Sequence, residues 1–190
     1  MSIRPSDLMH WLGASRRQLE DLDASPFRDL GEESAEGEPY GRALLAESAE
    51  AELLLMRWAP GVACAPHDHA DASGIVRVLW GELRETVFTR SDDSLDVALG
   101  RPLRAGDVVE FGRGHVHQMC AEGAAATLHV YRPRIRGMRV WDLDAGRLLV
   151  VDDAHGAFVP RDAARIVASR PWPPARLEPA VRGPATPQKP

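Results

Sequence analysis

The 190-residue sequence has only two cysteines, no long apolar run and no excess of basic side chains. Cys64 and Cys120 are too few for a disulfide framework, and they fit a protein whose thiols stay reduced, as in the cytoplasm. No apolar stretch approaches the length of a membrane span. Lys and Arg number 23 against 28 Asp and Glu, so the net charge is -5. That balance argues against a nucleic-acid-binding surface.

The two ends of the sequence differ from its centre. Residues 6–22 predict an amphipathic helix capped by Ser6, with leucines such as Leu12 and Leu19 on or near one face. Polar residues interrupt the N-terminal segment, which therefore has no continuous apolar region, and we expect no signal peptide.

Near the C-terminal end, residues 161–169 predict a short helix. After Ser169 the chain is rich in proline and is expected to be disordered, because it cannot bury enough apolar surface to offset its ordering entropy.

The central region predicts many short strands separated by turns. Gly and Pro turn signals, such as Pro60-Gly61, fall between the apolar runs. The candidate strands are 43–47, 51–59, 75–80, 82–89, 94–98, 107–111, 116–120, 125–132, 138–143 and 147–152. Strands at this spacing are typical of an all-β barrel or sandwich. We therefore expect three parts: an N-terminal helix and loop (1–39), a barrel (40–155) and a C-terminal extension (156–190).

Histidines provide the most specific chemical signal in the sequence. His67 and His69 are separated by one residue, so on an extended segment both imidazoles face the same side and can bind one metal ion. A third histidine follows the segment from Gly106 to Gly114. The glycine spacing favours His117 as this third ligand, and His115 is the alternative.

Two glycine-framed segments resemble the motifs of the cupin superfamily. The first contains His67-Asp68-His69 and closes at Gly81, and the second runs from Gly106 to His117. The resemblance implies a double-stranded β-helix (jelly-roll) barrel that holds a metal through three histidines and usually one glutamate. Here Gly74 stands at the glutamate position, which would leave a cationic site with open coordination positions.

A narrower resemblance is to the cysteine dioxygenase family, in its bacterial type. It is carried by the segment from His67 to Thr86 and by Leu128-His129-Val130-Tyr131-Arg132-Pro133, and it covers roughly residues 40 to 146. The resemblance implies an Fe(II) cofactor and conversion of L-cysteine and O2 to cysteine sulfinic acid.

The resemblance also assigns roles to individual residues. His67, His69 and His117 match the iron ligands. Tyr40-Gly41-Arg42 matches an element whose arginine binds the substrate carboxylate, a task that suits a planar guanidinium. The remaining matched residues are Thr127, His129 and Tyr131, which correspond to a hydroxyl, imidazole and phenol relay. Alternation along a strand places these three side chains on one face, where His129 can orient the Tyr131 hydroxyl toward the metal.

One departure concerns Tyr131. Some family members carry a cysteine that cross-links to this tyrosine, and Gly74 occupies that position here. Cys64 and Cys120 lie elsewhere and are expected to be core thiols.

Three alternative functions remain open. The protein could oxidise another small thiol such as 3-mercaptopropionate, for which related enzymes tend to have glutamine at the Arg42 position. It could be a non-catalytic cupin that binds a metal, although binding alone does not require the Thr127-His129-Tyr131 row. It could also be a metal-dependent isomerase or lyase. The expected partners are a small thiol and O2, with no nucleic acid or membrane, and the expected state is a monomer or a small homo-oligomer.

Overall fold

The computed structural model describes residues 5–173 and consists mainly of antiparallel strands. Its helices are α1 (Pro5–Trp11), α2 (Arg16–Glu20) and two 3-10 turns (Ser25–Phe27 and Ala163–Arg165). The strands are β1 (Tyr40–Glu47), β2 (Glu52–Trp58), β3 (His67–Asp68), β4 (Ser73–Trp80), β5 (Glu82–Arg90), β6 (Leu95–Arg104), β7 (Val108–Phe111), β8 (Val116–Ala121), β9 (Ala125–Arg132), β10 (Arg139–Asp142), β11 (Arg147–Val151) and β12 (Ile166–Pro171).

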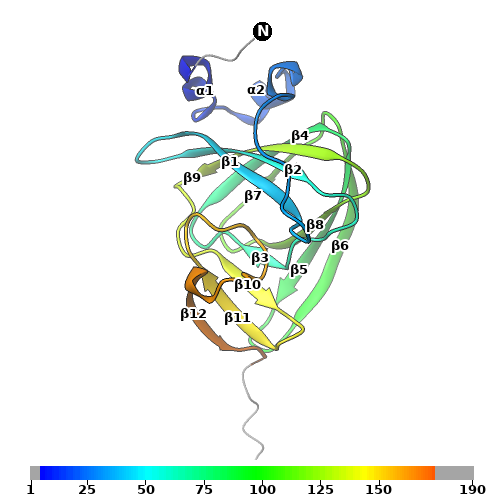
Figure 1. Ribbon diagram of the computed structural model, residues 1–190, viewed down its shortest axis with the longest axis vertical. Coiled ribbons are helices and arrows are strands. Elements are labelled where there is room, and N and C mark those ends of the chain that lie inside the picture. The colour runs from blue at the N-terminus through cyan, green and yellow to red at the C-terminus, as the bar shows by residue number, and fades with distance from the viewer. Residues whose placement is uncertain (1–4, 174–190) are drawn as a thin grey trace, which may run out of the picture.

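The strands form two facing sheets. One has the order β1-β2-β9-β4-β7, and the other has the order β12-β11-β10-β3-β8-β5-β6. Figure 1 shows α1 and α2 at one end of the molecule and β10, β11 and β12 at the other. The all-β barrel expected from the sequence is confirmed.

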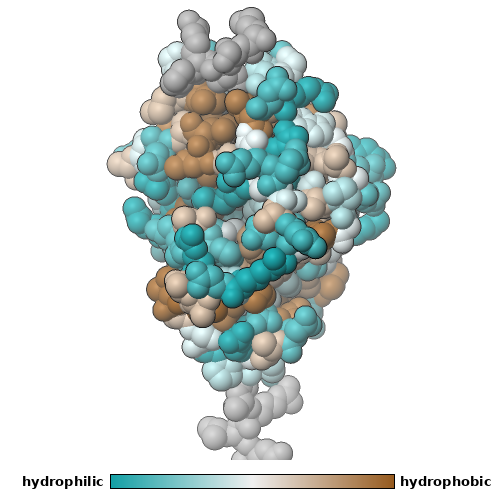
Figure 2. Space-filling view, in the orientation of Figure 1, coloured by the Kyte–Doolittle hydropathy of each residue, from teal (hydrophilic) through white to brown (hydrophobic). Residues whose placement is uncertain are grey.

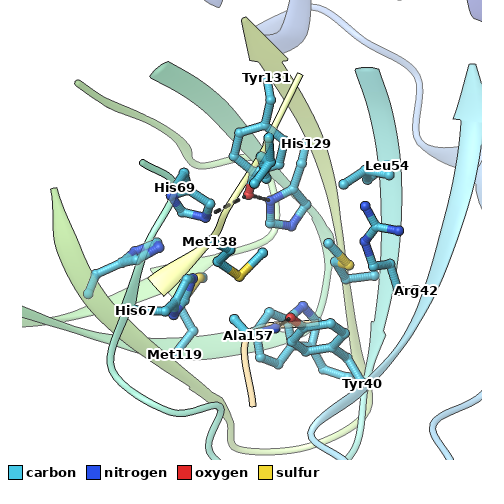
Figure 3. A pocket seen from close by; sticks show the side chains of 14 residues that line it. Tyr40, Arg42, Leu54, His67, His69, Met119, His129, Tyr131, Met138 and Ala157 are labelled. Atoms are coloured by element: carbon cyan, nitrogen blue, oxygen red, sulfur yellow. Dashed lines mark hydrogen bonds between the residues drawn. The ribbon is translucent and has the colours of Figure 1, made fainter. Parts of the chain in front are cut away.

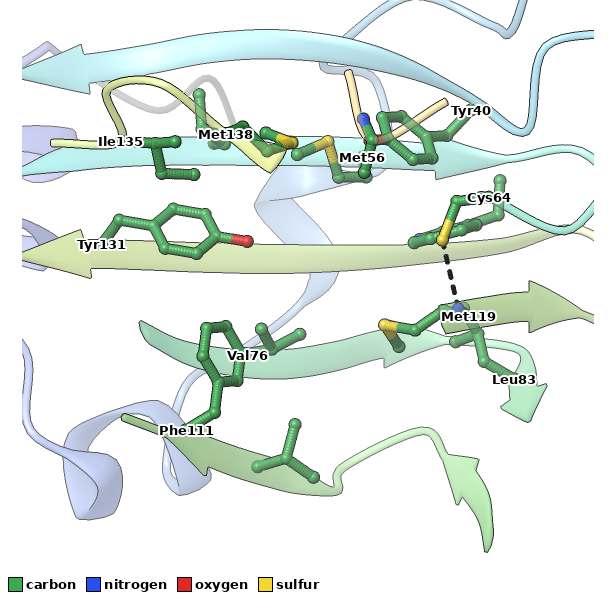
Figure 4. Close-up of a cluster of buried hydrophobic side chains, with 14 of the residues drawn as sticks. Tyr40, Met56, Cys64, Val76, Leu83, Phe111, Met119, Tyr131, Ile135 and Met138 are labelled. Carbon is green, nitrogen blue, oxygen red and sulfur yellow. Dashed lines mark hydrogen bonds between the residues drawn. The ribbon is translucent and has the colours of Figure 1, made fainter. Parts of the chain in front are cut away.

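The five-stranded sheet is buried on both faces at its centre. In β2, Leu54 and Met56 belong to the core between the sheets, whereas Leu53 and Leu55 belong to a second core beneath the N-terminal helices. Figure 4 shows inward-pointing side chains of the first core. In Figure 2 hydrophobic residues gather near the N-terminal end of the visible face, while most of the remaining face is polar. Burial on both faces holds β2 and β9 firmly in register, and β9 carries the predicted relay.

The expected helix over residues 6–22 is wrong in its continuity. The chain forms α1 and α2 instead, and Ser15 caps α2 through a capping box with Gln18. Gly13 lies in the break, where its low helix propensity favours interruption. The guanidinium of Arg132 donates hydrogen bonds to the carbonyl oxygens of Leu12 and Ala14, which stabilises the break.

The C-terminal extension also differs from expectation. The predicted helix at 161–169 is a 3-10 turn followed by β12, which pairs with β11 from Val151 to Arg147. Trp172 is buried against Trp141. These contacts offset the ordering cost that led us to expect disorder after Ser169, so the described chain is ordered through Pro173. The remainder of the predicted disordered tail, residues 174–190, lies outside the described residues. In the described part of the chain, no helix is long and apolar enough to cross a bilayer.

Candidate metal centre

Three buried histidines meet at the centre of the seven-stranded sheet. His67 on β3 is the register partner of His117 on β8, and His69 follows directly after β3. One possible ligand atom from each ring lies within 4.8 Å of those of the other two. The structure thus brings together the three histidines that the motifs selected. Figure 3 labels His67 and His69 of this cluster.

The hydrogen bonds of these rings leave nitrogen atoms available for a metal. The Nδ1 atom of His67 is 2.9 Å from the carbonyl oxygen of Ala65, and the Nδ1 atom of His117 is 2.9 Å from Oε1 of Glu85. The Nε2 atom of His117 is buried and lacks a hydrogen-bond partner among residues 5–173. Burial lowers the pKa of His67 and His69 well below the ordinary value. Neutral imidazoles with free nitrogens fit a divalent transition metal.

The turn after His69 depends on the buried carboxylate of Asp68. Its Oδ1 atom accepts hydrogen bonds from the backbone N–H of Ala70 at 3.0 Å and from Nε of Arg139 at 2.9 Å. Ala70 has a φ of 52°, a left-handed conformation that costs free energy for a non-glycine residue. The strand ends at Asp68 and the turn follows His69. His67 and His69 both belong to the cluster, as alternation along an extended segment predicts.

A second carboxylate orients His117 from behind. Glu85 on β5 is 1% exposed and pairs with Arg101, whose Nε atom lies 2.8 Å from Oε2. Burial alone would raise the pKa of Glu85, but the interactions with His117 and Arg101 outweigh it and lower the pKa to about 2. A carboxylate bonded to the remote nitrogen of a metal-binding histidine fixes the tautomer and the ring orientation. Sequence reasoning missed Glu85 and Arg101, which have no fixed spacing from the histidine motifs.

The alternative ligand, His115, lies outside the buried cluster. It is partly exposed, stacks on Phe111 at 5.7 Å between ring centroids, and its Nε2 atom is 4.0 Å from Oε1 of Glu85. Together with Glu85 and His117 it forms a second group of possible ligand atoms. The fully buried arrangement is the one with His67 and His69.

The predicted relay on β9 forms a continuous row of hydrogen bonds. Oγ1 of Thr127 is 2.6 Å from Nε2 of His129, and Nδ1 of His129 is 2.9 Å from the hydroxyl oxygen of Tyr131. The Tyr131 hydroxyl is in turn 3.2 Å from Nε2 of His69. The row therefore ends at the histidine cluster, as Figure 3 shows.

Tyr40 and Arg42 lie on β1 across the cavity from the histidines (Figure 3). Arg42 contacts the carbonyl oxygens of Asp153 and Ala154 at 3.4 and 3.5 Å, and its Nη2 atom is 3.7 Å from the buried carboxylate of Glu52. The Tyr40 hydroxyl accepts a hydrogen bond from the backbone N–H of Ala157. Glu52 was not expected from the sequence, and it offsets part of the Arg42 charge.

These groups line a narrow cavity of about 20 Å³. Apart from the histidines, Tyr40, Arg42 and Tyr131, its walls are mostly apolar. The apolar lining residues include Leu54, Met56, Met119, Ile135, Met138 and Ala157. A groove outside shares Tyr40 and Arg42 with the cavity.

Gly74 is the register partner of Tyr131. A Cβ atom at Gly74 would lie 2.9 Å from Cε1 of Tyr131 and would overlap the ring of Phe111. Phe111 therefore occupies the space that a larger residue would need. The structure therefore leaves no room for a side chain at residue 74 beside Tyr131.

Both cysteines are free thiols, and the sulfur of Cys64 lies 3.9 Å from Nδ1 of His67, at the edge of the histidine cluster. Cys64 is buried, and its sulfur accepts a hydrogen bond from the backbone N–H of Met119 at 3.1 Å. Burial raises the pKa of this thiol to about 12. Cys120 is half-buried.

Comparisons with known proteins agree with the geometry. A family described as cysteine dioxygenase type I matches residues 34–144. Cysteine dioxygenase type 1 of Danio rerio is 27% identical over 118 residues, which cover 56% of this chain and 58% of that protein. The match thus spans somewhat more than half the length of this curated relative.

Several solved structures are similar over part of the chain. They include a protein with a double-stranded β-helix domain from Klebsiella pneumoniae (TM-score 0.49, 21% identity, covering 57% of this chain and 89% of that one). KdgF from Halomonas sp. has a TM-score of 0.47 and 17% identity, covering 56% of this chain and 92% of that one. An RmlC-like cupin from Shewanella frigidimarina has a TM-score of 0.46 and 18% identity, covering 56% of this chain and 87% of that one. The two facing antiparallel sheets are those of a cupin double-stranded β-helix. Since the family match covers more than half of the residues, the chain belongs to the cysteine dioxygenase type I family.

Proposed function

We propose that this protein is an iron(II)-dependent dioxygenase that converts L-cysteine and O2 to cysteine sulfinic acid. The observation that carries the proposal is the shared cavity. Three histidines, the Tyr131 hydroxyl and the Arg42 guanidinium all line it. Family membership supports the same chemistry.

The proposed reaction needs no additional reductant. Two S–O bonds form and the O–O bond breaks, so the sulfur is oxidised while O2 is reduced, and the thiol proton ends on the sulfinic acid or in solvent. His67, His69 and His117 would hold the iron, which when bound supplies the redox chemistry that lets O2 react with a thiolate.

The protein's own side chains would position the substrate. Arg42 binds the carboxylate with its planar fork. The Tyr131 hydroxyl donates a hydrogen bond to the reacting oxygen or sulfur atoms. The apolar walls exclude water, which strengthens both interactions.

The direct test is to load the purified protein with iron(II) and to measure O2 uptake and sulfinate formation with L-cysteine, 3-mercaptopropionate and cysteamine. We expect the highest kcat/KM with L-cysteine. Preference for 3-mercaptopropionate would contradict the proposed substrate. Bound iron without O2 uptake on any thiol would contradict the enzyme and favour a metal-binding cupin.

His117→Ala and His115→Ala form a matched pair for the ligand assignment. The first removes one of three ligands and should lose bound iron and activity, whereas the second should keep most of both. Retention of iron by His117→Ala, with its loss in His115→Ala, would overturn the assignment.

A further inference from the structure

The row of hydrogen bonds formed by Thr127, His129 and Tyr131 includes one more side chain, which bonds to Thr127 from a neighbouring strand. The indole Nε1 atom of Trp58, on the neighbouring strand β2, is 2.8 Å from Oγ1 of Thr127. All four side chains are buried, with exposures from 0 to 4%. The Tyr40 ring packs against the indole at 4.7 Å between ring centroids, which holds Trp58 in place.

The indole gives the row a direction. A tryptophan N–H can only donate, so Thr127 must accept from Trp58. The Thr127 hydroxyl must still donate its own proton to an acceptor. In the described residues its other side-chain partner is Nε2 of His129, 2.6 Å away. Thr127 therefore donates to His129, and Nε2 of His129 is the acceptor.

The direction then passes to Tyr131. Burial, followed by the charges of His117 and Arg42, lowers the pKa of His129 to about 3, so the ring carries one proton at neutral pH. With Nε2 accepting, that proton is on Nδ1 and is donated to the Tyr131 oxygen 2.9 Å away. Because the Tyr131 oxygen accepts from His129, the hydroxyl proton of Tyr131 points toward His69 and the cavity.

We infer that Trp58 is a positioning residue whose indole N–H fixes the tautomer of His129, so that Tyr131 presents a hydrogen-bond donor to the cavity. In the reverse direction Tyr131 would donate to His129 and offer only its lone pairs to the cavity. That arrangement would leave the buried Thr127 proton without an acceptor among residues 5–173, which is unfavourable. The catalytic consequence rests on the proposed function, but the direction of the row is a property of the metal-free protein.

The test is 15N NMR of the metal-free protein labelled at the histidine ring nitrogens, with His129 signals assigned from their loss in His129→Leu. We expect a protonated Nδ1 and an unprotonated Nε2 in the unmodified protein. In Trp58→Phe the indole N–H is gone, so the Thr127 proton can rotate into the vacated space and bond to water there. The Thr127 oxygen can then accept from Nε2 of His129, and the Nε2-protonated tautomer should appear. Trp80→Phe, a substitution of the same kind in the other core, should leave His129 unchanged.

A protonated Nε2 in the unmodified protein, or an unchanged tautomer in folded Trp58→Phe, would overturn the inference. If Trp58→Phe fails to fold, Thr127→Val removes the same donor to Nε2, and Thr127→Ser should restore the original tautomer. In the iron-loaded protein, kcat should fall in proportion to the lost Nδ1-protonated population, with little change in KM. Absence of all dioxygenase activity would refute the proposed function while leaving the NMR result to decide the role of Trp58.

Discussion

Among the described residues that line the cavity, Arg42 carries the charge that could meet a substrate carboxylate, and the buried Glu52 pairs with it. The guanidinium of Arg42 is mostly buried and lies 3.7 Å from the Glu52 carboxylate, which also accepts a hydrogen bond from the backbone N–H of Ile135 at 2.8 Å. Glu52 thus fixes the position of Arg42 while reducing its net charge. A substrate carboxylate would bind to an arginine that is already oriented, which lowers the entropic cost of binding.

Arg42→Gln tests the recognition of the carboxylate. It should reduce kcat/KM for L-cysteine more than for cysteamine, which has no carboxylate. We expect the difference to be about 2–5 kcal/mol, as for the loss of one partner from a buried charge pair. The measurement is steady-state O2 uptake with both thiols.

Arg42→Gln also leaves the Glu52 carboxylate without its ion-pair partner. The double substitution with Glu52→Gln removes that side effect and serves as the control. If the double variant loses kcat/KM equally for L-cysteine and cysteamine, Arg42 does not bind the substrate carboxylate.

The two cysteines should differ sharply in reactivity. Cys64 is 1% exposed and burial raises its pKa to about 12, so at pH 8 it is protonated and shielded. We expect a thiol reagent to modify Cys120 in the native protein and Cys64 only after unfolding. Rapid labelling of native Cys120→Ser would contradict this.

Single residues also show what could be predicted from the sequence. His67, His69, His117 and the β9 row were found because they occur in motifs with fixed spacing. The groups that orient them could not be found in this way. Glu85, Arg101 and Trp58 reach the site from other strands, and only the folded pairing of those strands brings them close.

At the scale of elements, β4 and β9 form the wall that carries Tyr131. Their register places Gly74 opposite Tyr131, and Phe111 from β7 fills the space above the glycine. The absence of a side chain at residue 74 is therefore a packing requirement of this wall. Most strands were predicted from alternation and turn signals, but β3 was missed because it has only two residues.

Gly74→Ala should destabilise the wall. The added methyl group overlaps the buried Phe111 ring, and overpacking of this kind costs about 1–3 kcal/mol. The measurement is the free energy of unfolding in urea. Gly112→Ala is the control, since a Cβ atom there meets nothing within 4 Å.

A second substitution makes this test specific. Phe111→Leu in the Gly74→Ala background should recover part of the lost stability, because the smaller side chain vacates the space. If Gly74→Ala and Gly112→Ala have equal effects, Phe111 does not restrict residue 74.

At the scale of the whole molecule, the two sheets enclose the site and the C-terminal region covers it. The backbone N–H of Ala65, beside the histidine motif, donates to the carbonyl oxygen of Ala157 at 2.9 Å. Past this contact the chain returns as β12 to extend the sheet. The sequence did not predict β12, because its residues after Ile166 are all exposed and give no alternating apolar pattern.

We propose that this enclosed site transfers both atoms of one O2 molecule to a thiol sulfur. The most direct measurement is mass spectrometry of the product formed by the iron-loaded protein from L-cysteine under 18O2. We predict cysteine sulfinic acid with both sulfinate oxygens labelled, and one O2 consumed for each sulfinate formed. A product with one label or none, or O2 uptake without sulfinate, would contradict the account.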